Sequence, residues 1–524
     1  MVTPAAEARL VEGLRADLAA ARFTVDVLDD LLGPVAAGAL HRDQVLPAVR
    51  VTHASTDPAA VLLRLFVLGV PVPRRALDRA VPTLRSVGLE RLRLVATAGG
   101  GADDEVRASV DLRPYAAVDG AGEASWWLAS DLGEMVTGGA LRSDHVLGVG
   151  GASTTLAQVT VRSPRRRTLD VGTGCGVQAL HAARHSDVVV GTDTSVRALA
   201  FARFNAALAG VALDLRQGSL FEPLSGPAGG GLPEQFDLVV SNPPFVITPR
   251  VSGVPLYEYR DGGRSGDDLV RDVVTQVGQH LVPGGVAQLL GNWEHRRGEG
   301  WSERVAGWLD ASGLDGWVVQ REVLDPAEYA EMWMRDGGTT VARDPEAWRQ
   351  RYDAWLEDFR ARDVEAIGLG MVVLRRPVTG GPTLRRVEEQ SGAVRQPLGP
   401  HVEAVLAAHD WLQGVTSGGP EGLLGARLVV AGDVTEERHL VPGASDPSVV
   451  LLRQGEGYGR AVQAGTALAG LVGACDGELT VGQLAGALAA LLDVPVADLR
   501  SELLPQVVDL VRDGFLAPAP PSVR

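Results

Sequence analysis

TLDVGTGCG, residues 168–176, decides the fold, because it is typical of a buried strand that runs into a glycine turn. Closely spaced glycines let the backbone approach a bound ligand where a Cβ atom would clash. In an open α/β sheet such a turn lies at the carboxyl ends of the strands, where ligands bind. The glycines follow the spacing G-x-G-x-G and not G-x-G-x-x-G, which disfavours a dinucleotide-binding dehydrogenase.

The segments that follow alternate between strand and helix patterns. VQALHAARH (177–185) predicts a helix and DVVVGTD (187–193) a strand. SVRALAFARFNAALAG predicts a helix, with Ser195 as its N-cap and Gly210 as its C-cap. ALDLRQGSL (212–220) and FDLVVSNPPF (236–245) predict two more strands. This order predicts an open parallel sheet with helices on both faces.

Asp193 ends the strand that follows the glycine turn. A carboxylate at this place accepts hydrogen bonds from both hydroxyls of a ribose. A helix-capping acid is the alternative interpretation, since SVRAL follows directly. A glycine turn with an acid one strand–helix unit later predicts a ligand that contains adenosine.

Ser241-Asn242-Pro243-Pro244-Phe245 follows the strand that ends at Val240. Two prolines fix φ and remove two backbone donors, and each forces the residue before it into an extended conformation. We therefore predict a rigid loop in which the Asn242 side-chain carbonyl and the Pro243 backbone carbonyl point the same way. Two convergent acceptors suit a planar NH2 group, with Phe245 stacked on the attached flat system. The alternative is a tight turn without chemistry.

These motifs together resemble the class I S-adenosylmethionine-dependent methyltransferases. The resemblance implies S-adenosyl-L-methionine as cofactor, with its methionine part beside residues 170–176 and its ribose on Asp193. The cofactor-binding residues that it implies are Asp170, Gly172, Thr173, Gly174, Gly176, Asp193, Ser219, Leu220 and Asn242. The catalytic residues that it implies are Asn242, Pro243, Pro244 and Phe245. Cys175 is expected to pack against the cofactor.

The Asn-Pro-Pro motif resembles two methyltransferase groups with different substrates. One group methylates exocyclic amino groups of nucleic-acid bases, and the other the glutamine amide of translation release factors. The stretch Tyr259–Gly266, HLVPGG (280–285) and VITP after the motif resemble the glutamine group. Phe245 stands where that group usually has Tyr, and Phe is common among enzymes that modify ribosomal RNA bases. The resemblance covers residues 140–295 or so, and the segment 144–156 lies where the superfamily closes over its cofactor.

Three domains are predicted. Residues 1–124 form an N-terminal helical, winged-helix-like domain, in which helices precede a two-stranded flap. Residues 125–376 form the Rossmann-like methyltransferase domain, interrupted by a Trp-rich insertion at 293–365. Residues 377–524 form a C-terminal domain with a winged-helix-like end, in which Thr480 is expected to cap a helix.

Arginines and net charge bear on the substrate in opposite directions. Arginines gather at 74–93 and just before the cofactor strand, and a winged helix is typical of nucleic-acid binding. The net charge of −16, from 49 basic and 65 acidic residues, is unfavourable for phosphate contacts. We expect an exocyclic amino group of a base, in RNA rather than DNA, as the substrate. The alternatives are a protein glutamine in a release factor or similar protein, a small molecule, and a cofactor-binding regulator without activity.

Composition excludes several other classes of protein. The 524 residues are 45% hydrophobic, which suffices for a packed core. With two cysteines the chain has neither a disulfide scaffold nor a Cys-built zinc site, and no metal is predicted. The N-terminus lacks the pattern of a signal peptide, and no run of about 18 apolar residues predicts a membrane span. A cytoplasmic protein is expected.

Overall fold

The computed structural model describes residues 3–139, 141–225 and 232–520. The chain divides into two compact units: residues 1–157 with 163–391, and residues 158–162 with 392–524. Each unit is described by itself below. Among the described residues, no helix is both long and apolar enough to cross a lipid bilayer.

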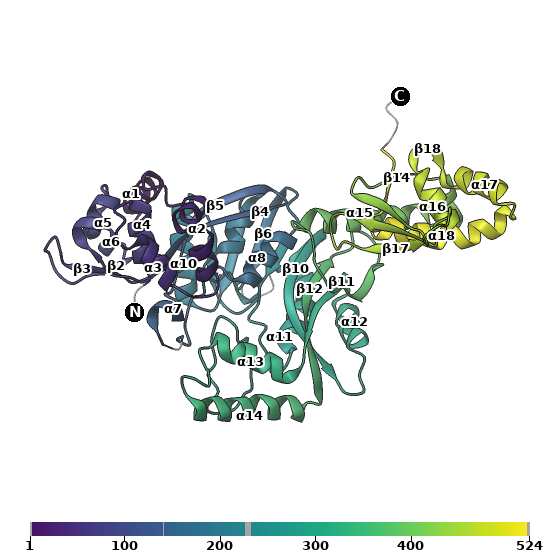
Figure 1. The fold of residues 1–524 in the computed structure, drawn as a ribbon. Coiled ribbons are helices and arrows are strands. Elements are labelled where there is room, and N and C mark those ends of the chain that lie inside the picture. Colours follow the sequence, from purple (N-terminus) through teal and green to yellow (C-terminus); the bar gives the residue numbers. More distant parts are fainter. Residues whose placement is uncertain (1–2, 140, 226–231, 521–524) are drawn as a thin grey trace. The chain divides into compact units, whose positions relative to one another are not determined.

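A large sheet organises the first unit, and within the described residues it has eight strands in the order β13-β11-β12-β10-β9-β6-β7-β8. Strands β8, β7, β6, β9 and β10 are parallel, whereas β12 runs antiparallel to both β10 and β11. The prediction of a Rossmann-like α/β fold is confirmed (Figure 1). The strands are β6 Arg165–Val171, β7 Ser186–Asp193, β8 Asp214–Gln217, β9 Phe236–Ser241, β10 Leu281–Arg296, β11 Asp315–Leu324, β12 Val364–Arg375 and β13 Arg385–Glu389.

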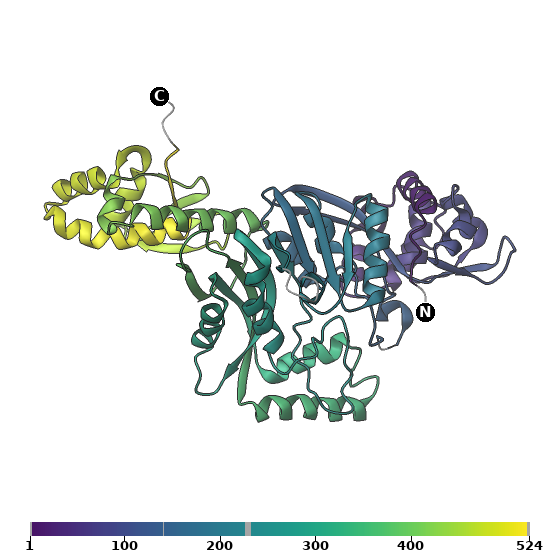
Figure 2. The same cartoon turned by 180° about the vertical axis from the view of Figure 1, so that it is seen from behind.

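Helices cover both faces of this sheet (Figures 1 and 2). One core contains Leu180 of α9 (Val177–Ala182) and Phe204 of α10 (Val196–Ala209). Another contains Val273 of α11 (Asp268–Gln276) and Leu309 of α12 (Trp301–Ser312), packed against β6, β9 and β10. The predicted caps of α10 are confirmed: the Ser195 side chain accepts from Ala198 N, and Gly210 is left-handed.

The N-terminal region belongs to the first compact unit and packs against helix α10. Arg15 donates to the carbonyl oxygens of Leu208 (2.9 Å) and Ala207 (2.7 Å) at the end of α10. The expected order of helices and flap is present, as a β1-β3-β2 sheet beside α5 and α6. The elements are α1 Ala8–Ala20, α2 Val25–Leu40, α3 Leu46–Thr52, α4 Pro58–Leu62, η1 Leu63–Val67, β1 Val72–Pro73, α5 Arg74–Ala80, α6 Arg85–Arg91, β2 Val95–Thr97, β3 Glu105–Ala108, β4 Asp111–Asp119, β5 Gly122–Ser130, α7 Glu134–Thr137 and α8 Gly151–Val159.

The segment 293–365 does not interrupt the sheet as the sequence suggested. Trp293 lies in β10 and Trp317 in β11, and both side chains are fully buried within the sheet's packing. The excursion from the sheet is shorter and consists of α13 (Pro326–Asp336) and α14 (Pro345–Ala361), between β11 and β12. Because β11 is buried on both faces, it lacks the alternation that marks a half-exposed strand.

The second unit combines α15 (Gly399–Val415) with two three-stranded sheets, β18-β14-β19 and β15-β16-β17. Its end has the expected order of helices, and the predicted cap is confirmed, since Thr480 and Gln483 form a capping box. The other elements are η4 Pro420–Gly425, β14 Arg427–Val430, β15 Val434–His439, β16 Val449–Gln454, β17 Ala461–Ala464, α16 Thr466–Gly473, β18 Asp476–Thr480, α17 Val481–Leu492, α18 Val496–Arg512 and β19 Leu516–Pro518, with η2 Glu222–Leu224 and η3 Val277–His280 in the first unit.

Candidate active site

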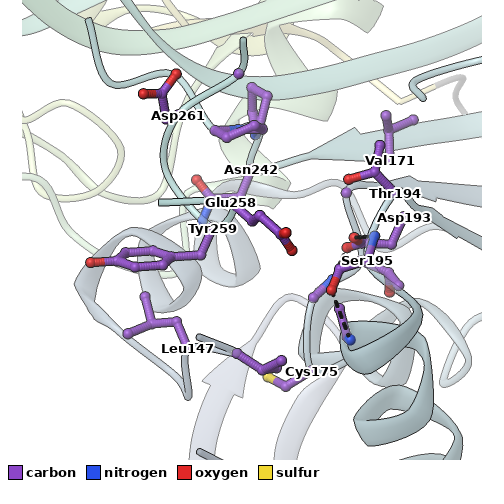
Figure 3. A pocket seen from close by; sticks show the side chains of 18 of the residues that line it. Leu147, Val171, Cys175, Asp193, Thr194, Ser195, Asn242, Glu258, Tyr259 and Asp261 are labelled. Carbon is purple, nitrogen blue, oxygen red and sulfur yellow. Dashed lines mark hydrogen bonds between the residues drawn. The ribbon is translucent and has the colours of Figure 1, made fainter. Parts of the chain in front are cut away.

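A cavity of about 320 Å³ opens at the carboxyl ends of β6, β7 and β9. The chain reverses its direction of travel across the sheet between β6 and β9, and ligands of open α/β folds bind at such a switch point. Figure 3 shows Asp193, Thr194 and Ser195 at one end of the cavity and Tyr259 and Leu147 at the other, with Asn242 and Glu258 between them. Of the predicted site residues, those that line the cavity are Gly172, Thr173, Gly174, Asp193, Ser219, Leu220, Asn242, Pro243 and Pro244.

The glycine turn is held by its own neighbours in the sheet. Gly172 and Gly174 have φ of 72° and 55°, a conformation that L side chains rarely adopt. Backbone amides of Gly172 and Thr173 both donate to the carbonyl of Thr192, each at 2.9 Å. The turn from β6 is therefore fastened to the end of β7, and its open face borders the cavity.

Asp193 both caps the local backbone and borders the cavity. Its Oδ2 accepts from Gly174 N at 2.9 Å and its Oδ1 from Ser195 N at 2.8 Å. Burial raises the pKa of this carboxyl above its usual range, although these backbone hydrogen bonds act in the opposite direction. Each carboxylate oxygen has a further lone pair, so capping and the binding of a ribose are compatible roles.

Two predicted cofactor-binding residues, Asp170 and Gly176, do not line the cavity, whereas Cys175 does. Asp170 lies behind the turn, where its Oδ2 accepts from Thr173 Oγ1 (2.6 Å) and Ala179 N (3.1 Å), and it does not line the cavity. Burial raises the pKa of Asp170 to about 7. Gly176 does not line the cavity either. It packs against α10, where a Cβ would lie 3.2 Å from the Cα atom of Ala202. Burial raises the pKa of the Cys175 thiol to about 11, so this lining residue is a packing group rather than a nucleophile.

The Asn-Pro-Pro loop carries an unsatisfied acceptor on a residue that lines the cavity. Asn242 Oδ1 is buried and has no hydrogen-bond partner among the described residues. Leaving such a group unpaired costs about 1–3 kcal/mol, so its position indicates a ligand. The Pro243 carbonyl already accepts from Phe245 N at 2.7 Å and has one more lone pair to offer.

Phe245 does not line the cavity, contrary to the expected stacking on a substrate. Its ring instead packs edge-to-face on Trp333 of α13, with ring centroids 6.4 Å apart. The loop after it is fastened to the same helix, since Ile247 N donates to Tyr329 Oη at 3.1 Å. The motif alone gave no sign of α13, which lies more than 80 positions further along the chain and buries this ring.

Several lining residues carried no motif of their own. His145, Glu258, Tyr259 and Asp261 also line the cavity. The two segments that contribute them meet, because Glu258 N donates to the Ser143 carbonyl at 2.8 Å. Burial lowers the pKa of His145 and raises the pKa of Asp261. A sequence signal did exist, since residues 144–156 and 259–266 carried part of the family resemblance.

The residues fit S-adenosylmethionine on two observations of this cavity. The glycine turn leaves room that a side chain would take, and Asp193 keeps free acceptor sites for hydroxyls. The acidic groups Asp193, Glu258 and Asp261 also suit a positively charged sulfonium, and no Arg or Lys stands among the described residues that line the cavity.

The fold and the cavity define a class I methyltransferase domain, and the comparison of sequences agrees. Residues 147–297 match the family model of the methyltransferase small domain and are identified as such a domain. S-adenosylmethionine is accordingly its cofactor. Residues 20–109 and 403–518 match two domains of unknown function, DUF7059 and DUF7782.

Curated relatives match part of this chain. A release factor glutamine methyltransferase of Geobacter sulfurreducens is 36% identical over 156 residues, which are 28% of this chain and 50% of that protein. A ribosomal protein uL3 glutamine methyltransferase of Bradyrhizobium diazoefficiens is 31% identical over 200 residues, 35% of this chain and 59% of that protein. The chain thus spans about half the length of the curated relatives it matches.

A solved 16S rRNA guanine-N2 methyltransferase of T. thermophilus, with its methyl donor and guanosine bound, is also similar. The match has a sequence identity of 19% and a TM-score of 0.26, and it covers 51% of this chain and 66% of that protein. This score is too low for a conclusion about the substrate.

Several of the arginines that suggested nucleic-acid binding form ion pairs within the protein. In the N-terminal region Arg75 pairs with Asp103 and Arg91 with Glu7. In the cluster before β6, Arg162 is buried and Arg167 pairs with Glu234 at 2.6 Å. Burial and pairing favour a structural role for the cluster before β6, whereas Arg75 and Arg91 in the N-terminal region stay more than half exposed.

Proposed function

We propose that this protein is an S-adenosylmethionine-dependent N-methyltransferase whose acceptor is the side-chain amide of a glutamine in another protein. The observation that carries the proposal is the buried, unpartnered Oδ1 of Asn242, a residue that lines the same cavity as Asp193. An acceptor there binds an N–H of a planar NH2 group and orients its nitrogen.

Two observations favour a protein amide over a nucleic-acid base. The curated relatives are named for glutamine methylation. The cavity offers carboxylates and, among its described lining residues, no Arg or Lys for a phosphate. A glutamine side chain is neutral, so it enters an acidic cavity without the repulsion that a nucleotide meets.

The chain's residues contribute orientation rather than acid–base chemistry. When bound, the cofactor supplies an electrophilic methyl group on a sulfonium. Asn242 Oδ1, with the second lone pair of Pro243 O, accepts hydrogen bonds from the NH2 group and directs its lone pair along the line of transfer. With the cofactor bound, the amide nitrogen held by Asn242 and Pro243 would take the methyl group, the sulfonium would leave as a neutral thioether, and the nitrogen would then release one proton to water. Proximity and alignment are worth about 7–11 kcal/mol in favourable cases.

Methyl transfer to defined acceptors tests the proposal. The purified protein is incubated with methyl-labelled S-adenosylmethionine and, separately, with a bacterial release factor, ribosomal protein uL3 and total RNA. Label on a glutamine, located by peptide mass spectrometry and absent with Asn242→Ala, supports the proposal. Label in RNA nucleosides favours base methylation, and no label in any acceptor contradicts methyl transfer to these classes.

A further inference from the structure

The end of the cavity opposite Asp193 is called the acceptor end, because the substrate amide is proposed to bind there. It has an aromatic side chain, that of Tyr259. Figure 3 shows the Tyr259 ring beside Leu147, at the opposite end from Asp193, with Asn242 between them. Tyr259 lines the cavity and Phe245 does not. Resting on the function proposed above, we propose that Tyr259 is the aromatic residue that contacts the planar group of the substrate, and that Asp336 positions it.

Contacts around Tyr259 fix the plane of its ring. Its hydroxyl donates to Asp336 Oδ2 at the end of α13, at 2.9 Å. The ring of His145 meets it edge-on, with centroids 5.8 Å apart and planes at 70°. Burial raises the pKa of Tyr259, so the hydroxyl stays a donor throughout the physiological range.

Arg260 also attaches the segment that contains Tyr259 to α13. Its guanidinium donates to the Trp333 carbonyl and to Asp336 Oδ2, both at 2.7 Å. It also lies over the ring of Tyr257 at 4.5 Å. Asp336 therefore receives hydrogen bonds from two consecutive residues, Tyr259 and Arg260, and couples the position of the cavity wall to the excursion between β11 and β12.

The arrangement has a chemical consequence for the substrate. A flat amide presents two faces, and a ring held at one end of the cavity covers one of them by van der Waals contact. A ring held by a carboxylate on another helix does not need to be reoriented when the substrate enters, which reduces the entropy lost on binding. Tyr259 is therefore a substrate-contacting residue, whereas Asp336 is a positioning residue that acts through it.

Steady-state kinetics on the acceptor that takes label in the experiment above test the inference. The variants are Tyr259→Leu, Tyr259→Phe, Asp336→Ala, the double variant and Phe245→Leu, and affinity for S-adenosylhomocysteine is measured by calorimetry for each. Tyr259→Leu is expected to raise KM for the acceptor about tenfold with affinity for S-adenosylhomocysteine within twofold, since an aromatic contact of about 1.4 kcal/mol is tenfold. Tyr259→Phe and Asp336→Ala are each expected to raise KM by a similar factor, smaller than that of Tyr259→Leu, because each removes the hydrogen bond that holds the ring. Asp336→Ala adds nothing in the Tyr259→Leu background.

Other outcomes overturn the inference. An unchanged KM for Tyr259→Leu, or a larger KM effect from Phe245→Leu, assigns the contact elsewhere. Additive effects of Asp336→Ala and Tyr259→Leu contradict the positioning role. If the wild-type protein binds S-adenosylhomocysteine and transfers label to no acceptor, the proposed function fails and this inference fails with it. Normal transfer with an indifferent Tyr259 rejects the inference alone.

Discussion

The glycine turn and the Asn-Pro-Pro loop border one cavity, yet they are held in different ways. Gly172, Thr173 and Gly174 are fastened by groups at the end of the adjacent strand β7, about 20 positions along the chain. The Asn-Pro-Pro loop is supported from α13 through Tyr329, 82 positions from Ile247. The cofactor end is thus built within one strand–helix unit, whereas the acceptor end depends on a remote excursion of the sheet.

This difference teaches where specificity resides. An element supported locally keeps its shape whatever is attached further along the chain, so the same turn serves a whole class of enzymes. An element supported by a remote helix changes when that helix changes. We therefore expect the two ends to respond separately to mutation, with effects on cofactor affinity at one end and on the acceptor at the other.

Asn242→Ala is expected to give the largest effect on methyl transfer. If it does not, the proposed separation of the cofactor end from the acceptor end is wrong. Loss of the orienting acceptor lowers kcat for methyl transfer 100- to 1000-fold, by analogy with the removal of one preorganised hydrogen-bonding group, about 2.7–4 kcal/mol. Affinity for S-adenosylhomocysteine, measured by calorimetry, stays within twofold. A loss of that affinity comparable with the loss of kcat places Asn242 at the cofactor end instead.

Asp193→Ala should act at the other end. A hydrogen bond to a charged group is worth about 1.5–3 kcal/mol, so affinity for S-adenosylhomocysteine falls about 10- to 100-fold. Asp187, an exposed aspartate at the start of the same strand, provides the matched control, and Asp187→Ala leaves affinity unchanged. Equal behaviour of the two variants argues against the ribose contact.

Tyr329→Phe tests the acceptor end through its support, because it removes the hydroxyl that holds the segment after the Asn-Pro-Pro loop. The fully buried Tyr329 hydroxyl accepts from Ile247 N and Asn292 Nδ2, at 3.1 and 2.7 Å, and both donors lose their acceptor. We expect the free energy of unfolding to fall by about 1–3 kcal/mol. KM for the acceptor rises while affinity for S-adenosylhomocysteine stays the same.

Tyr352→Phe is the control for this prediction, because the Tyr352 hydroxyl bonds the exposed Glu331 on the same excursion. Denaturant unfolding and kinetics on both variants provide the measurement. If Tyr329→Phe weakens the binding of S-adenosylhomocysteine as much as it raises KM, the two ends are not independent.

The pH dependence of cofactor affinity is the smallest expected effect. Burial raises the pKa of Asp193, so a falling pH protonates this carboxyl sooner than an exposed one and removes its charge. Affinity for S-adenosylhomocysteine therefore decreases several-fold as the pH falls from neutrality through this raised pKa. Asp193→Asn, which carries no charge, shows a weaker overall affinity and loses that part of the dependence. Parallel pH profiles for the two proteins in calorimetric titrations contradict this assignment.

Much of the cofactor end was predictable because its signals are local. A glycine with positive φ, an aspartate at a strand end and a serine cap each act within a few residues, so the spacing in the sequence reports the geometry. The exceptions are Asp170, which lies behind the turn and accepts from Ala179 N of α9, and Gly176, which packs against Ala202 of α10.

The acceptor end was predictable only in part. Asn242, Pro243 and Pro244 line the cavity, and their catalytic role stays a prediction. The loop itself was predictable because prolines constrain the backbone wherever they stand. No local sequence rule predicted that Tyr259, and not Phe245, would line the cavity, since contacts with α13 orient each ring.

The sequence by itself determined the order of strands and helices, the turn beside the cofactor and the rigid loop after β9, since short-range sterics and hydrogen bonds specify them. The tertiary structure decided which aromatic ring reaches the cavity, which arginines are free to bind a partner and where the excursion begins. Those outcomes depend on contacts between residues tens of positions apart, and such contacts leave no periodic trace in the chain.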